Sequence, residues 1–334
     1  MRRRRPGDGD DRGAPPLSAV TVDDAVLEET RELNRWLAEE LAEQRPVNEV
    51  PPAETRSARR EGRSFWPQPE FLPEAQDLFI PARGGEIRLR VLRPGGDVTG
   101  VYFHIHGGGW VLGRADEQDV RLLGLAEATG LCAVSVDYRL SPECAYPAAP
   151  DDCEDAAVWL LERGFAELDV PEVATIGGES AGAHLSATTL LRLRDRHGVT
   201  GAFQGANLVY GVYDLSMTPS SRNWGDNFLI LSSPSMYWFG TCFTGERTLE
   251  ELTDPDLSPL YAELHDLPPA LFTVGTLDPL LDDSLFMSAR WQAAGNEAEI
   301  RVYPEAVHGF NLFPTAMARA ANDTQHEFLR GAVS

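Results

Sequence analysis

The sequence predicts an α/β fold in which one largely parallel sheet of about eight strands carries helices on both faces. Short β-rich runs alternate with helical stretches along most of the chain. These runs are almost continuously apolar, as strands covered on both faces are. With 334 residues, 43% of them apolar and 24% charged, the chain can bury a large core and is not a disordered protein.

The predicted strands are the eight β-rich runs. They lie at 77–80, 86–92, 100–105, 131–136, 173–177, 206–210, 270–274 and 298–303. The turn Arg83-Gly84-Gly85 separates the first two runs and predicts an antiparallel hairpin at the start of the sheet. The later runs alternate with helical stretches that include 117–129, 151–163 and 181–197.

Two segments interrupt this pattern and predict a helical cap. Apolar residues at helical spacing follow Thr21, which we expect to be the N-cap of a helix that ends before Pro46. They are Val22, Val26, Leu33, Trp36, Leu37 and Leu41. The stretch from 46 to 73 is rich in proline and arginine and predicts a connecting segment.

The second interruption is an aromatic insertion, which we expect to pack with the N-terminal helix as a cap over the sheet. Its large side chains are Trp224, Phe228, Leu229, Ile230, Leu231, Met236, Tyr237, Trp238, Phe239 and Phe243. They are expected to form the core of the cap, to line an acyl pocket or to form an oligomer interface. The predicted organisation is a disordered tail at 1–16, an N-terminal cap segment at 17–74, a core at 75–214 and 256–334, and a cap insertion at 215–255.

Charge and composition exclude several classes of function. The formal net charge of −23 disfavours nucleic acid and anionic membrane surfaces as partners. The sequence contains no lysine, which excludes pyridoxal-phosphate enzymes, Schiff-base aldolases and P-loop NTPases. No run approaches 18 apolar residues, so no stable membrane insertion is expected. The basic residues that open the tail lack a following apolar region, so they predict no export signal, although a small basic contact patch is an alternative to disorder.

The four cysteines, Cys132, Cys144, Cys153 and Cys242, have no metal-ligand spacing. We therefore expect reduced thiols in a cytoplasmic protein that holds no metal and no other cofactor. Pairing of two copies through the strand at 298–303 is a route to a homodimer that the sequence leaves open.

The strongest chemical signal is Gly178-Glu179-Ser180-Ala181-Gly182, between the strand at 173–177 and a helical run. A serine on a sharp strand-to-helix turn needs small neighbours, because side chains there would meet adjacent backbone. The turn exposes the hydroxyl and places the following N–H at a helix N-terminus, where negative charge is favoured. The motif predicts Ser180 as a nucleophile.

A second signal, His106-Gly107-Gly108-Gly109-Trp110, follows the strand at 100–105. Three glycines let backbone N–H groups approach a ligand closely. The run lacks the spacing of a dinucleotide site, and it occupies the place from which a hydrolase completes its oxyanion hole.

A serine nucleophile needs an imidazole to accept its proton and a carboxylate to orient that imidazole. His308 follows the last predicted strand, whereas His104 alternates along a strand as a core residue and His184 lies on the helix after the serine. Asp278 follows the strand at 270–274; Asp282 and Asp283 come later, where acidic residues serve a helix dipole. The order Ser180, Asp278, His308 is that of α/β-hydrolases.

With these motifs the sequence resembles the hormone-sensitive-lipase-like family of α/β-hydrolases, the bacterial carboxylesterases with an HGGGW motif, over roughly 75–330. Further matching segments are Asp137-Tyr138-Arg139-Leu140-Ser141-Pro142-Glu143, Tyr146-Pro147-Ala148-Ala149, Asp278-Pro279-Leu280-Leu281-Asp282-Asp283, Tyr303-Pro304 and His308-Gly309-Phe310. Ala183 and His184 stand where the family more usually has Gly-Asn.

The resemblance implies a serine carboxylesterase with a helical cap that hydrolyses short- to medium-chain esters through an acyl-enzyme. Ser180, Asp278 and His308 would be its triad, and the N–H groups of Gly108, Gly109 and Ala181 its oxyanion hole. An acyltransferase or amidase with the same triad is the main alternative. A ligand-binding receptor on a hydrolase fold is another, and the complete set of three catalytic groups argues against it.

Overall fold

The computed structural model describes residues 18–226 and 229–334, and the tail predicted at 1–16 and Phe228 lie outside this part. One sheet has the strand order β1-β9-β8-β7-β6-β4-β5-β3-β2. Its strands are β1 Ser18–Ala19, β2 Gln76–Ala82, β3 Gly85–Leu92, β4 Gly100–Ile105, β5 Leu131–Asp137, β6 Ala174–Glu179, β7 Phe203–Val209, β8 Ala270–Leu277 and β9 Ala298–Val307. The mostly parallel α/β-hydrolase sheet expected from the sequence is thus confirmed.

Strand direction follows the sequence pattern. β3 is antiparallel to both of its neighbours, β2 and β5, and the other neighbouring pairs are parallel. β4, between β5 and β6, is buried along its whole length, as its continuous apolar run predicts.

A ninth strand, β1, was not expected from the sequence. Two residues are too few for a periodic signal, and β1 exists because it pairs with β9, with Ser18 opposite Arg301 and Ala19 opposite Val302. Val20 N–H extends this pairing to the carbonyl of Val302 at 2.9 Å. A homodimer that pairs along this edge of β9 would therefore have to displace β1.

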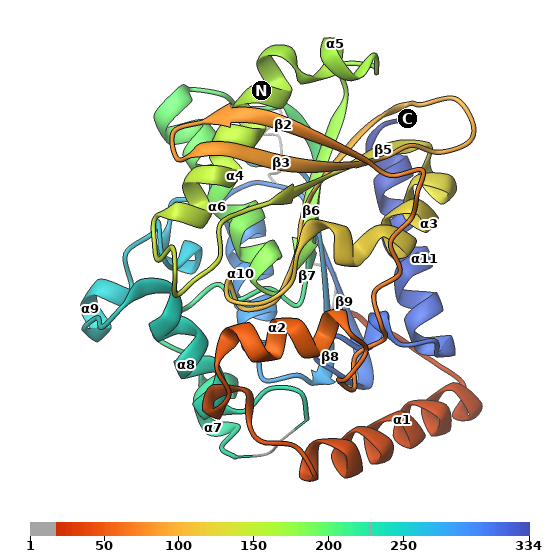
Figure 1. Cartoon of the computed structure of the whole chain (residues 1–334), viewed down its shortest axis with the longest axis vertical. Coiled ribbons are helices and arrows are strands. Elements are labelled where there is room, and N and C mark those ends of the chain that lie inside the picture. The colour runs from red at the N-terminus through yellow and green to blue at the C-terminus, as the bar shows by residue number, and fades with distance from the viewer. Residues whose placement is uncertain (1–17, 227–228) are drawn as a thin grey trace, which may run out of the picture.

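The helices form two layers, one on each face of the sheet (Figure 1). α3 and α11 contact each other on one face, and α4, α6 and α10 lie on the other. Their bounds are α3 Asp119–Thr129, α4 Ala148–Trp159, α6 Ala181–His197, α10 Leu281–Ala293 and α11 Ala316–Ala332. Shorter helical elements are η2 Ala115–Gln118, η3 Leu160–Gly164, α5 Phe165–Leu168, η4 Pro259–Tyr261 and η5 Phe310–Leu312. No helix of the described part is long and apolar enough to cross a bilayer.

A group of helices outside these layers lies across one end of the sheet (Figure 1). From the N-terminal segment come α1 Asp24–Ala42, η1 Val47–Glu49 and α2 Pro52–Arg60. From the insertion come α7 Pro219–Asn223, α8 Ser233–Thr244 and α9 Leu249–Leu252. We call this group the cap segments; α8 contacts η1, so the two parts meet.

Helix α1 differs from its expected form in two respects. Its N-cap is Asp23 and not Thr21, because a carboxylate oxygen of Asp23 accepts the Val26 N–H at 2.9 Å. Trp36, expected within the buried stripe, is 40% exposed and meets Phe313 edge-on. Leu37 and Leu41 are the buried members of the stripe and join a cluster that includes Ile230.

The helix α2 was not expected, because the sequence from 46 to 73 predicted only a connecting segment. Its nine residues include three arginines and no large apolar side chain. The side chain of Arg56 fixes α2 to the core. Its guanidinium donates to the carbonyls of Val111 and Ser141, each at 2.7 Å, and forms a bidentate ion pair with Glu143. The helix is therefore fixed by contacts distant in sequence.

Candidate active site

Ser180 lies between the end of β6 and the start of α6 with φ 57° and ψ −119°. Its N–H donates to the carbonyl of Val209 at 2.9 Å, and its own carbonyl accepts from Ala183 and His184, each at 3.1 Å. A non-glycine residue at positive φ is strained, and such strain is typical of functional turns. The turn predicted from the motif is present.

The glycines on either side of Ser180 are required by close packing. A Cβ on Gly178 would lie 2.0 Å from the carbonyl oxygen of Ile105, and a Cβ on Gly182 would lie 1.9 Å from the same atom. Backbone cannot yield to such contacts, so β4 can approach the turn only where both residues lack side chains.

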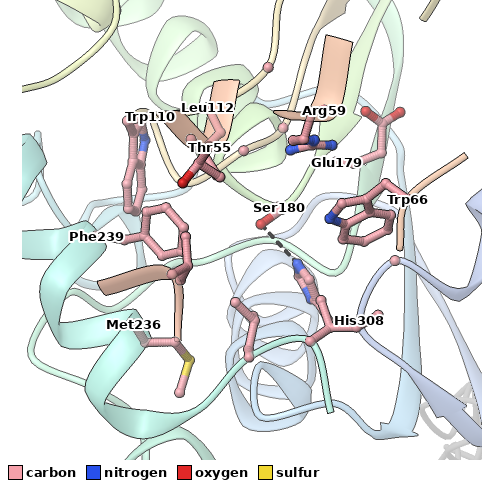
Figure 2. Close-up of a pocket in the computed structure, with 18 of the residues that line it drawn as sticks. Thr55, Arg59, Trp66, Trp110, Leu112, Glu179, Ser180, Met236, Phe239 and His308 are labelled. Carbon is pink, nitrogen blue, oxygen red and sulfur yellow. Dashed lines mark hydrogen bonds between the residues drawn. The ribbon is translucent and has the colours of Figure 1, made fainter. Parts of the chain in front are cut away.

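The structure brings Ser180, His308 and Asp278 together from three separate segments. The carboxylate of Asp278 accepts from Nδ1–H of His308 at 2.9 Å, which leaves Nε2 as an acceptor. The Ser180 hydroxyl donates to this Nε2 at 3.0 Å, the bond drawn in Figure 2. His308 is 6% and Asp278 1% exposed, so the hydrogen bond between them is buried, whereas Ser180 is partly exposed to the cavity. The second oxygen of Asp278 accepts the Leu280 N–H at 2.9 Å, which fixes the carboxylate plane.

The loop that carries His308 is covered by aromatic side chains. The ring of Tyr210 lies 4.6 Å from the His308 ring, and its hydroxyl donates to Asn311 at 2.6 Å. Trp66, from the segment after α2, covers Gly309 so closely that a Cβ there would meet its ring at 2.6 Å. The N-terminal segment therefore packs over the loop that carries the imidazole.

The glycine loop after β4 folds back beside Ser180. Gly108 has φ 115°, and its carbonyl accepts from Val111 and Leu112 at 3.1 and 2.8 Å, which makes a tight turn. His106 anchors the loop: its Nδ1–H donates to the carbonyl of Gly107 at 2.8 Å, and its own carbonyl accepts from the Tyr138 hydroxyl at 2.9 Å. Burial lowers the pKa of His106 to about 4, so the ring is neutral at physiological pH.

Glu179, beside the serine, is a buried charge with two partners. It forms an ion pair with Arg121 and lies 3.2 Å from Nε2 of His104. Burial alone would raise the pKa of Glu179, but Arg121 and His104 outweigh it and hold the pKa at about 2. Glu179 is thus a carboxylate whose charge Arg121 already balances. His104 is fully buried, as expected.

Ser180 and His308 open into a cavity of about 790 Å³ between the sheet and the cap segments (Figure 2). The glycine loop forms one wall, and apolar side chains of the cap segments form much of the rest. The apolar lining from the cap segments includes Leu41, Ala58, Ile230, Leu231, Met236 and Phe239. The cavity volume is typical of a small-molecule site.

The insertion's aromatic residues divide between two of the expected roles. Phe243 is fully buried and stacks on Trp110 with ring centroids 4.6 Å apart, so it belongs to the core. Phe239 lines the cavity, where a Cβ on Gly109 would meet its ring at 2.3 Å. Tyr237 lines the cavity and is 62% exposed.

Asp282 and Asp283 lie in the first turn of α10, as expected, and also hold the base of the insertion. Asp282 accepts the Ser220 N–H at 2.8 Å. Asp283 is fully buried and accepts from the Tyr213 and Asp214 N–H groups at 2.7 and 3.0 Å. Their hydrogen bonds go to the insertion, and Asp278 is the carboxylate that reaches the imidazole of His308.

The cavity wall includes residues of the stretch from 46 to 73 that the sequence did not predict. Arg59 of α2 and Trp66 lie in the Pro- and Arg-rich stretch that predicted only a connection. An isolated arginine or tryptophan there has no periodic signal.

The chain has extensive similarity to known proteins. Residues 102–312 match a protein family described by the alpha/beta hydrolase fold. The chain is 35% identical over 267 residues to the carboxylic ester hydrolase LipN of Mycobacterium tuberculosis, over 78% of this chain and 70% of that protein. It is 30% identical over 275 residues to an acetyl esterase of Salmonella schwarzengrund, over 80% of this chain and 82% of that protein.

Solved structures of esterases also superpose on this chain. A hyperthermophilic esterase from the archaeon Pyrobaculum calidifontis superposes with a TM-score of 0.81 at 30% identity, over 91% of this chain and 98% of that one. A thermostable esterase from Pseudomonas putida superposes with a TM-score of 0.81 at 26% identity, over 94% of this chain and 99% of that one.

Proposed function

The chain belongs to the hormone-sensitive-lipase-like family of α/β-hydrolases and is a carboxylic-ester hydrolase acting on small-molecule esters, and we propose that it works through an acyl-enzyme on Ser180. The observation that carries this proposal is the pair of hydrogen bonds that runs from Ser180 through His308 to Asp278, at 3.0 and 2.9 Å. A hydroxyl with such partners can lose its proton as it attacks.

In the first half of the reaction, Oγ of Ser180 attacks the ester carbonyl carbon while its proton passes to Nε2 of His308. The carbonyl oxygen becomes an oxyanion, and the N–H groups of Gly108, Gly109 and Ala181 are the donors that we propose stabilise it. Asp278 stabilises the imidazolium and keeps its orientation. The imidazolium then gives its proton to the departing alkoxide, which leaves as the alcohol.

In the second half, water replaces the alcohol. His308 takes a proton from the water as its oxygen attacks the acyl carbon, and returns that proton to Oγ of Ser180 as the carboxylic acid leaves. The proton count closes over the cycle, and the chemistry draws on no group beyond those of the chain and water.

The cavity supports short- to medium-chain esters as substrates. A volume of about 790 Å³ with an apolar lining suits an acyl chain of modest length. We expect kcat/KM across p-nitrophenyl esters of increasing length to peak at short to medium chains and to fall for long ones. Product analysis with competing alcohols and amines separates hydrolysis from acyl transfer and amide cleavage.

The nucleophile is tested by Ser180→Ala. The variant should fold and lose at least about 10³-fold in kcat, since triad replacements in serine hydrolases have effects of this size. An organophosphate should label the unaltered chain at Ser180 and fail to label the variant. Robust turnover by the folded variant would contradict the proposal.

A further inference from the structure

The arginines of the cavity differ in one respect, the presence of a carboxylate partner. Those that line it are Arg45, Arg59, Arg63, Arg114, Arg121 and Arg247. Five of them have a carboxylate oxygen within 4.0 Å. The pairs are Arg45–Glu54, Arg63–Glu61, Arg114–Asp116, Arg121–Glu179 and Arg247–Glu251. Within residues 18–226 and 229–334, Arg59 forms no such ion pair.

Arg59 is held in place by its helix and by an aromatic ring, with no carboxylate of residues 18–226 and 229–334 within ion-pair distance. It lies on α2, one turn after Arg56, which fixes the helix to the loop after β4. Its guanidinium carbon lies 5.2 Å from the ring centroid of Trp66, a cation–π distance. Trp66 in turn stacks on Phe313 at 5.6 Å, so the ring that supports Arg59 is itself fixed.

The guanidinium faces the reaction centre. Figure 2 shows Arg59 directed into the hollow into which Ser180 and His308 also point, with Trp66 at its side. Burial lowers the pKa of Arg59, while Glu117 opposes that effect. Glu117 acts on Arg59 from beyond ion-pair distance, and its ion pair, at 3.7 Å, is with Arg60. Arg59 is therefore a half-buried cation that a bound anion would satisfy.

We propose that Arg59 binds a carboxylate carried by the substrate, so that the enzyme favours esters with a free carboxylate near the scissile bond. A planar guanidinium pairs with a carboxylate through two parallel hydrogen bonds, and such charge-assisted bonds are strong where water is excluded. The proposal rests on the esterase mechanism above, because Ser180 defines where the scissile bond lies.

The carboxylate can belong to either half of the ester, and matched substrate pairs distinguish the two. For the acyl half, 4-nitrophenyl hydrogen glutarate is compared with its neutral methyl ester. For the alcohol half, 2-acetoxypropanoate is compared with 2-acetoxypropanamide. The measured quantity is the ratio of kcat/KM for the anionic and the neutral member of each pair, in the unaltered chain and in variants.

In the unaltered chain, we expect kcat/KM for the anionic member to be well above that for the neutral member in at least one pair. Arg59→Gln should lower this ratio about tenfold or more, mainly by raising KM for the anionic member. Arg59→Lys should keep part of it, because a point charge remains. The matched control is Arg63→Gln, which removes the same charge from a cavity arginine that already pairs with Glu61. That variant should keep the ratio.

In the substrate comparison, three outcomes would overturn the proposal. They are no preference for the anionic member of either pair in the unaltered chain, a preference that Arg59→Gln retains, and a preference that Arg63→Gln loses equally. If Arg59→Gln fails to fold, inhibition of the unaltered chain by small carboxylates tests the same proposal. Glutarate should compete with a neutral ester more strongly than glutaramide, and equal inhibition contradicts the proposal. Ser180→Ala assayed on the neutral ester tests the mechanism separately, so failure of one proposal is distinct from failure of the other.

Discussion

Nε1–H of Trp110 donates a hydrogen bond to Nδ1 of His184 at 3.1 Å. The bond joins the glycine loop to α6, the helix that starts after Ser180. Nε2–H of His184 donates to the carbonyl of Leu257 at 2.8 Å, where the chain re-enters the core after the insertion. His184 is fully buried, and its two hydrogen bonds connect α6 to the glycine loop and to the end of the insertion.

The variant His184→Leu should lower the free energy of unfolding by about 1–3 kcal/mol, because it leaves the buried Trp110 N–H without an acceptor. It should also lower kcat, because the glycine loop loses a support. Chemical denaturation and steady-state kinetics measure the two effects. His265→Leu is the control, since that ring is 57% exposed and its loss should cost little. Equal effects from both variants would contradict this role of His184.

The stability that His184 provides should depend on pH. Burial lowers its pKa to about 4, and both ring nitrogens are occupied by the bonds to Trp110 and Leu257. As pH falls below about 6.5, the unfolded chain binds a proton that the folded chain refuses, so stability is lost on acidification. The difference in unfolding free energy between the unaltered chain and His184→Leu should shrink from pH 7 to pH 4, by at most about 1.4 kcal/mol per pH unit. A constant difference over that range would refute the assignment.

Asp278→Asn should lower kcat by on the order of 10²–10⁴-fold with the fold retained, because the imidazole loses both its orientation and the stabilisation of its charged form. Asp282→Asn is the matched control on the same segment, since its carboxylate accepts from Ser220 and not from His308. It should change kcat little. The reverse order of effects would show that the wrong carboxylate has been chosen.

Deletion of residues 1–16 should leave kcat/KM unchanged, because this segment has no apolar periodicity with which to offset the entropy of ordering. Deletion of residues 1–45 should lower solubility and weaken the use of longer acyl chains. It removes Leu37 from a buried cluster and Leu41 from the cavity wall. Labelling of Ser180 by an organophosphate should persist. Full activity with the same chain-length profile after the longer deletion would show that α1 has no role in the cap.

The sequence by itself determined the features that depend on neighbouring residues. The glycines around Ser180 identify a sharp turn because the steric limits of backbone act within a few residues. The apolar runs identify central strands such as β4, β5 and β8 because residues buried on both faces of a sheet must be apolar. His308 and Asp278 could be chosen because each follows a strand, and the carboxyl ends of parallel strands meet at one edge of a sheet.

Tertiary structure alone decided what depends on partners distant in the chain. β1 exists only through its pairing with β9. α2 carries no apolar stripe and is fixed by Arg56, whose acceptors lie more than fifty residues away. Asp283 accepts a hydrogen bond from the base of the insertion. The sequence alone could not show this, because an acidic residue in the first turn of a helix is common without such a partner. Arg59 has no carboxylate within ion-pair distance in the part of the chain that the structure describes, and the sequence could not show this. Whether an arginine has an ion-pair partner depends on which carboxylates the fold brings close to it, and the local sequence pattern carries no information about that distance.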